Sequence, residues 1–360
     1  MLSSSFPSYW SVRPFEPAGY GIGNYWGTAE ELDEMVLRCS EAGVSVIANI
    51  VLNHFTWERG NSSLGNPINS PDTGDFPSVP YTKENFHEAR GLHKVRTEDP
   101  YVQQKIVEYL TTLLELGIAG FRVDLAWAME SEDLRTIFNQ LPDIVMGGRP
   151  FIVHEIYYHD PDLVEFGRMI SNQARFLITN AIRPNHTGTT YLNLGGKNML
   201  WHEGWGKPGG HSLDHYVSWV DNHNTGGEGD KFLFYGDTPE QRLHYKLGIS
   251  YMLASDFAVK RMFSTFFAHY HNLHLPAQRG LCGSETDYYG DPGVGDDTYV
   301  CQHRWSVFRA MVTFANHVQE EPAEMIHRLT DAIVFSRGNK GLFAMGPGLE
   351  LIGELEPGEF

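Results

Sequence analysis

The 360-residue sequence has little positive charge and no long apolar run. Lys and Arg number 27 against 45 Asp and Glu, which gives a net charge of −18. Because binding to a phosphate backbone requires clustered Lys and Arg, this balance argues against a nucleic-acid partner. No apolar stretch reaches the roughly 20 residues that span a bilayer, so we expect no membrane span.

The sequence has few cysteines, and its first residues do not have the pattern of a signal peptide. The three cysteines, Cys39, Cys282 and Cys301, match no zinc or redox spacing. Either Cys282 and Cys301 form one bridge across a Gly- and Asp-rich loop and Cys39 stays free, or all three are buried thiols. The first residues, Met1–Phe6, lack the basic region and apolar stretch of a signal peptide. Either the chain is not exported or an earlier segment precedes it, so the sequence leaves the compartment open.

Short apolar strands alternate with amphipathic helices along the chain. Thr28 and Glu31 fit a capping box at a helix start, and Gly43 is typical of the end of that helix. Between them runs an apolar stripe at helical spacing, made of Leu32, Met35, Val36 and Cys39. Residues 44–52 then predict a buried strand. The unit recurs, with helices predicted at 101–116, 132–141 and 239–253 and strands at 118–123, 151–155 and 216–221. This alternation favours a parallel α/β sheet or barrel.

Two segments depart from the alternation. Residues 55–94 are rich in Gly, Pro, Asn and Ser and lack periodicity, which predicts an inserted loop subdomain. The barrel would then comprise residues 1–54 and 95–320. Short alternating runs after residue 320 predict a partial antiparallel β domain over 321–360.

Polar residues gather at the carboxyl ends of the predicted strands, where a (β/α)₈ barrel carries its chemistry. They are Asn53, His54, Arg122, Asp124, Glu155, Asp221, Asn222 and His223. Asp124 and Glu155 are the pair of carboxylates that glycoside hydrolysis requires. Arg122, two residues before Asp124 on one strand face, would hold that carboxylate ionised. The alternative is a buried Arg–Asp pair that only supports the barrel.

The sequence around these residues resembles that of the α-amylase superfamily, and most closely that of the animal-type α-amylases. Gly120-Phe121-Arg122-Val123-Asp124 resembles its Gly-Phe-Arg-x-Asp segment. Leu52-Asn53-His54 resembles its first signature and Val220-Asp221-Asn222-His223 its last. The resemblance implies a (β/α)₈ barrel, a loop subdomain after strand three, a C-terminal antiparallel β domain and retaining hydrolysis of α-1,4-glucosidic bonds. It begins near Pro14–Tyr20, so we expect a barrel incomplete at its N-terminus and a truncated C-terminal domain.

The resemblance also implies roles for individual residues. Asp124 matches the nucleophile, Glu155 the general acid/base and Arg122 the arginine that orients the nucleophile. Sugar contacts are implied for His54, His223 and Tyr81. The calcium position keeps Asn53, and the chloride position keeps Arg122 and Asn222.

Several family residues are replaced. Asn224 stands where the third catalytic carboxylate is expected, and Asn49 replaces an aspartate of the first signature. Lys94 aligns with a calcium-binding aspartate, and a cation there would repel Ca²⁺. The remaining replacements are Trp127 and Ala128 for a Lys-His pair, Phe266 or Phe267 for a basic chloride ligand, and Gly226-Gly227-Glu228-Gly229 for the mobile substrate loop. We therefore expect neither calcium nor chloride to be bound, and no other cofactor.

Three functions follow as hypotheses. The first is a catalytically impaired pseudoenzyme that serves as a structural or interaction subunit, because a barrel missing a unit needs a protein partner to cover its strand edges. The second is an active α-1,4-glucan hydrolase that uses only Asp124 and Glu155. The third is a carbohydrate-binding protein that keeps an aromatic cleft for an α-glucan. The family is typically secreted.

Overall fold

The computed structural model describes only part of the chain. The described residues are 2–8, 11–23, 27–57, 59–62, 64–68, 76, 79–87, 92–156, 160–170, 175, 178–179, 182, 215–222, 233, 238–263, 302–328 and 332–346. The chain divides into two compact units, Met1–Met169 and Ile170–Phe360, and each is described by itself. Cys39 is a free thiol, while Cys282 and Cys301 lie outside the described residues.

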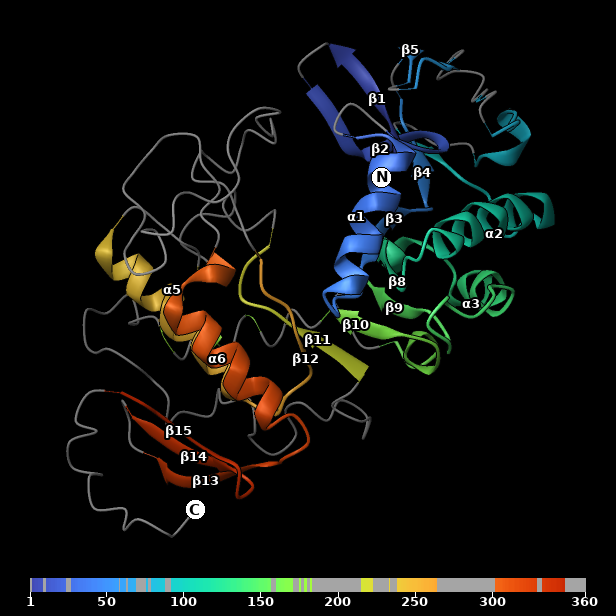
Figure 1. Cartoon of the computed structure of the whole chain (residues 1–360). Helices are drawn as coiled ribbons and strands as arrows, with labels where there is room; N and C mark the ends of the chain where they lie inside the picture. The colour runs from blue at the N-terminus through green and yellow to red at the C-terminus, as the bar shows by residue number, and fades with distance from the viewer. Residues whose placement is uncertain are drawn as a thin grey trace. The chain divides into compact units, whose positions relative to one another are not determined.

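The core of the first unit is a parallel sheet with the strand order β3-β8-β9-β10 (Figure 1). Its strands are β3 (Ile47–Val51), β8 (Gly120–Asp124), β9 (Phe151–His154) and β10 (Arg168–Ile170). The helices are α1 (Ala29–Glu41), α2 (Pro100–Glu115) and α3 (Ser131–Asn139), and α2 packs against α3. Short 3₁₀ turns are η1 (Lys83–Asn85), η2 (Ala126–Ala128) and η3 (Leu163–Glu165). The predicted alternation of helices and parallel strands is confirmed.

Local sequence explains where α1 begins. The Thr28 hydroxyl accepts a hydrogen bond from the Glu31 backbone N–H at 3.2 Å, and the Glu31 carboxylate accepts one from the Thr28 N–H at 2.8 Å. The predicted capping box is therefore present. Leu32 and Val36 are buried, whereas Met35 is 41% exposed, so the buried stripe of α1 is narrower than the sequence indicated.

Gly120 is required where β8 meets β9. A Cβ atom at this position would lie 2.1 Å from the carbonyl oxygen of Phe151, which is far inside van der Waals contact. Any larger residue would push β8 and β9 apart. The glycine of the Gly120–Asp124 segment thus sets the approach of the two strands that carry the candidate catalytic residues.

The described part of the excursion after β3 contains short antiparallel pairs. β4 (His54–Phe55) pairs with β7 (His93–Lys94), and β5 (Gly60–Asn61) pairs with β6 (Pro67–Ile68). Phe55, Phe76, Tyr81 and Phe86 of the excursion form a cluster of aromatic rings in edge or tilted contact, which Tyr20 of β2 and Tyr109 of α2 extend. Ring packing of this kind stabilises a segment that has little regular secondary structure.

The sequence did not predict the hairpin of β1 (Leu2–Ser8) and β2 (Ser11–Ile22), which opens the chain. Its register shifts three times, and β2 contains two prolines, so the alternation that signals a strand is broken. The hairpin therefore gave no clear sequence signal.

In the second unit, β11 (Tyr216–Ser218) runs parallel to β12 (Val259–Lys260). Helices α5 (Pro239–Ala254) and α6 (Ser306–His317) pack together, and η8 (Gln302–Arg304) precedes α6. The antiparallel β structure predicted after residue 320 is confirmed as β13 (Ala323–Arg328), β14 (Ile333–Arg337) and β15 (Gly341–Met345). The buried Arg337 guanidinium ties this sheet to the end of α5 by donating to the carbonyl oxygens of Ala254 and Ser255.

Candidate active site

Two carboxylates meet at one edge of the first unit's sheet. In the parallel register Arg122 lies opposite Val153 and Val123 opposite His154, so Glu155 follows directly at the end where Asp124 closes β8. Both Asp124 and Glu155 are buried, each with 6% of its surface exposed. Asp124 and Glu155 therefore lie at the same end of two neighbouring strands, while their catalytic roles stay predictions.

Arg122 joins the two carboxylates. Its Nη1 atom forms an ion pair with Asp124, and its Nη2 atom lies 2.8 Å from Oε1 of Glu155. Nη1 also donates to Oδ1 of Asn49 on the neighbouring strand β3, at 2.9 Å. One guanidinium is thus the cation for two carboxylates. Asn49, at the position where the resemblance implies an aspartate, supplies only a neutral acceptor.

The other oxygen of Glu155 is also occupied. Oε2 accepts a hydrogen bond from the backbone N–H of Leu125 at 2.8 Å. Leu125 adopts the left-handed conformation, with φ 49° and ψ 34°, which costs a non-glycine residue on the order of 1 kcal/mol. Both oxygens of Glu155 therefore face N–H donors. A proton on either oxygen would point at the hydrogen of one of these donors.

Asp124 is the carboxyl that takes up a proton more readily than usual. Burial raises the pKa of Asp124 to about 6, the charge of Arg122 lowers it, and the nearby Glu155 carboxylate raises it. Retaining hydrolysis requires an ionised nucleophile and a protonated acid, and a raised pKa at Asp124 works against the first of these. The two carboxylates required for the reaction are therefore present. Glu155, the expected acid, accepts hydrogen bonds at both oxygens, whereas an acid must donate a proton.

His54 and Tyr81 are engaged by the protein. Nε2 of His54 donates to the carbonyl oxygen of Phe15 at 2.8 Å, and Nδ1 lies 3.2 Å from Nδ2 of Asn53. Burial lowers the pKa of His54, so the ring is neutral near pH 7. The Tyr81 hydroxyl donates to Val102, and its ring is only 2% exposed within the aromatic cluster. The sugar contacts implied for both residues stay predictions.

The last signature belongs to the second unit. Asp221 and Asn222 follow β11 and are buried. His223, Asn224, the loop 226–229 and Phe266–Phe267 lie outside the described residues. The roles expected for them, including the replaced third carboxylate, stay predictions.

The described residues do not fit a calcium site. Among them, no group of three or more His, Cys, Asp or Glu side chains is arranged to hold a metal ion. Oδ1 of Asn53 is a buried acceptor with no partner in the described residues, but Lys94 places its ammonium 2.8 Å from the Ala128 carbonyl oxygen. For chloride, Nε of Arg122 is a buried donor without a partner in that same part of the chain, and both Nη atoms already bind protein acceptors.

Three features of the site were not visible in the sequence. They are the left-handed Leu125, the bond from Lys94 to Ala128 and the contact between Asn49 and Arg122. The second and third left a signal, because Lys94, Ala128 and Asn49 each stand where the family carries another residue. None of the helices in the described ranges combines the length and apolar character of a membrane span.

Comparison with known proteins places these observations in a family context. The sequence is 30% identical to the alpha-amylase-related protein of Drosophila serrata, over 97% of this chain and 74% of the fly protein. It is 31% identical to the alpha-amylase-related protein of Drosophila simulans, over 92% and 71%. No protein-family model matches the sequence.

Solved structures share the fold. Alpha-amylase I from Eisenia fetida superposes with a TM-score of 0.73 at 24% identity, over 92% of this chain and 73% of that one. An alpha-amylase from Malbranchea cinnamomea gives a TM-score of 0.55 at 15% identity, over 94% and 71%. The fold is that of the α-amylase (β/α)₈ barrel, which confirms the fold class predicted from the sequence.

Proposed function

The chain belongs to the α-amylase superfamily, and from this premise we propose that it is a catalytically impaired member that acts as a structural or interaction subunit. One observation carries the proposal. Arg122 binds Asp124 and Glu155 together, and Leu125 binds the second oxygen of Glu155. Each oxygen of Glu155 then already accepts from a protein N–H group, so neither is free to donate a proton to a leaving group, and the raised pKa of Asp124 works against an ionised nucleophile.

Asn224 supports the same conclusion from the sequence. At the position of the third carboxylate it offers an amide, which cannot supply negative charge to an oxocarbenium-like transition state. Removing one such electrostatic contribution typically lowers the rate about 10²-fold. The two effects act on different parts of the reaction, so restoring one leaves the other.

A binding role is supported by exposed apolar side chains on α1, on the turn that follows it and at the start of β3. Met35, Leu37, Val44 and Ile47 are all more than two-fifths exposed. Exposed apolar side chains are typical of protein contact surfaces where they form a patch, and these four lie within one short segment of the sequence. The partner in this proposal is a protein, and light scattering on the purified chain should show an assembly or, with its partner added, a complex. A monodisperse monomer that binds nothing would contradict this part.

A second candidate is an active α-1,4-glucan hydrolase. It is favoured by the position of Asp124 and Glu155 on adjacent parallel strands, which suits a nucleophile and an acid/base. A third, α-glucan binding without turnover, is favoured by Trp127, whose side chain stays 46% exposed directly after β8.

The test compares the full chain with its Asn224→Asp variant on soluble starch and a maltooligosaccharide, with and without Ca²⁺ and Cl⁻. Both proteins, shown to be folded by circular dichroism, should release no reducing sugar above background. Activity in the variant alone would make Asn224 the only defect and remove the role given to Arg122 and Leu125. Activity in the parent chain would establish the hydrolase instead.

A further inference from the structure

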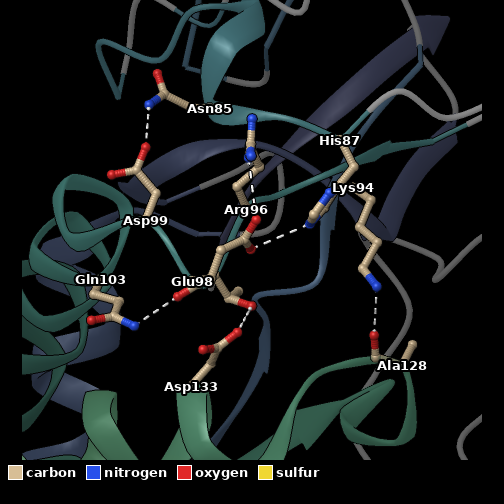
Figure 2. A network of polar contacts seen from close by, with 10 residues as sticks. Asn85, His87, Lys94, Arg96, Glu98, Asp99, Gln103, Ala128 and Asp133 are labelled. Carbon is tan, nitrogen blue, oxygen red and sulfur yellow. Dashed lines mark hydrogen bonds and ion pairs between the residues drawn. The ribbon is translucent and has the colours of Figure 1, made fainter.

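Lys94, which stands at the position of a calcium-binding aspartate, forms a direct bond between the excursion and the barrel. Lys94 ends β7, and in the antiparallel register it lies opposite His54 of β4. Its Nζ atom donates to the carbonyl oxygen of Ala128 at 2.8 Å (Figure 2). Ala128 ends η2, the turn that directly follows the strand of Asp124. A positive charge thus connects the excursion to the turn behind the candidate nucleophile.

The oxygen atoms around Lys94 do not suit a divalent ion. Calcium takes six to eight oxygen ligands and depends on carboxylates among them. Here Asn53 offers one buried amide oxygen without a partner in the described residues, and the Ala128 carbonyl already accepts from Lys94. The ammonium would repel a second cation at this point.

Other contacts attach the segment directly after Lys94, residues 95–97, to the barrel without a metal. The Thr97 hydroxyl donates to Asp133 in the first turn of α3 at 2.8 Å, and the Gln103 side chain of α2 donates to the Thr97 carbonyl at 2.9 Å. The Val95 N–H donates to the Asn53 carbonyl at 2.8 Å. Figure 2 shows the bond from Lys94 to Ala128 and labels Gln103 and Asp133, which bond to Thr97.

We infer that the Lys94 ammonium takes the structural place of a divalent cation and attaches the excursion to the barrel without metal. One lysine, fixed to the chain, donates to the Ala128 carbonyl oxygen and so joins the excursion to the barrel. Attachment then needs no ion from solution and does not depend on the calcium concentration. The inference does not require the site to be inactive, so its test is separate from that of the proposed function.

The first test uses the full chain without any substitution. Thermal unfolding is followed after dialysis against excess EDTA and again with excess Ca²⁺, and limited proteolysis reports on residues 54–97. The midpoint and the cleavage pattern should be the same in both conditions. A lower midpoint in EDTA that Ca²⁺ restores would overturn the inference, because the native chain would then use the metal.

Three variants test the role of Lys94 itself. Lys94→Met should lower the midpoint by about 2–4 °C with no recovery in Ca²⁺, whereas Lys83→Met, an exposed lysine of the same excursion, should leave it unchanged. Lys94→Asp should lower the midpoint in EDTA, recover it in Ca²⁺ and bind Ca²⁺ in calorimetry. The assignment would be contradicted if Ca²⁺ neither raised the midpoint of Lys94→Asp nor bound to it in calorimetry. It would also be contradicted if Lys94→Met unfolded at the same midpoint as the parent.

Discussion

Nη2 of Arg122 lies 2.8 Å from Oε1 of Glu155, while Nη1 of the same guanidinium binds Asp124. All three groups are buried. Two carboxylates taken from water need a positive charge that stays with them, and Arg122 is placed to supply it. The geometry therefore makes Arg122 a structural necessity as well as a neighbour of the reaction centre.

Replacing Arg122 should test that necessity. Arg122→Met is expected to lower the free energy of unfolding by about 3–5 kcal/mol, because Asp124 and Glu155 would remain buried without their cation. Chemical denaturation measures the change. Arg38→Met is the matched control, since Arg38 pairs with Glu34 across 4.0 Å on the exposed face of α1 and such a pair contributes little. Equal stability of the parent and Arg122→Met would show that the buried ion pairs are absent.

The defect assigned to Glu155 predicts a dependence on the leaving group. α-Maltosyl fluoride releases fluoride without a proton from an acid, so its hydrolysis bypasses that step. We expect the chain to hydrolyse this substrate slowly while starch stays intact, with a rate that rises with pH as Asp124 ionises around its pKa of about 6. Fluoride release is followed with an ion-selective electrode. An Asp124→Asn control should remove it, and equal failure on both substrates would refute an acid-specific defect.

Asp221 should make stability depend on pH in the second unit. Full burial raises the pKa of Asp221 to about 8, although the Tyr245 hydroxyl, 3.4 Å from Oδ1, lowers it. A raised pKa in the folded state means that the stabilisation is complete below the unfolded value near 4 and is lost as the pH rises through about 8.

The measurement compares the parent with Asp221→Asn by denaturation between pH 4 and pH 9. Over the interval between the two pKa values, the parent should lose about 1.4 kcal/mol per pH unit relative to the variant, which cannot ionise. A constant difference between the two proteins across the series would show that Asp221 does not titrate in this way.

The local parts of the fold could be predicted because their causes are local. Thr28 and Glu31 are three residues apart and together determine where α1 begins. The strands that carry Asp124 and Glu155 could be placed because apolar runs and helix ends alternate in the sequence. The family resemblance then supplied their roles.

The missed parts depend on contacts that no local pattern encodes. Lys94 and Ala128 are 34 residues apart, and their bond exists only once β7 lies beside η2. Leu125 takes a conformation that leucine rarely adopts, and only the folded site explains it. Met35 matches the helical stripe but lies at its exposed border.

The capping box offers a test of the local part. Thr28→Ala should lower the free energy of unfolding by about 1 kcal/mol, because the Glu31 N–H loses its acceptor. Thr112→Ala is the matched control, since the Thr112 hydroxyl only donates back to the Glu108 carbonyl oxygen within the last turn of α2. Thermal unfolding separates the two. A larger loss for Thr112→Ala would contradict the capping argument.

The central claim is that this chain does not hydrolyse α-glucan through Glu155. Its most direct test is the initial rate of maltooligosaccharide hydrolysis by the purified chain, measured beside Glu155→Gln at the same concentration. The account predicts equal rates, both at the background level. A parent rate about 10²-fold or more above that of Glu155→Gln would show working acid catalysis and contradict the account.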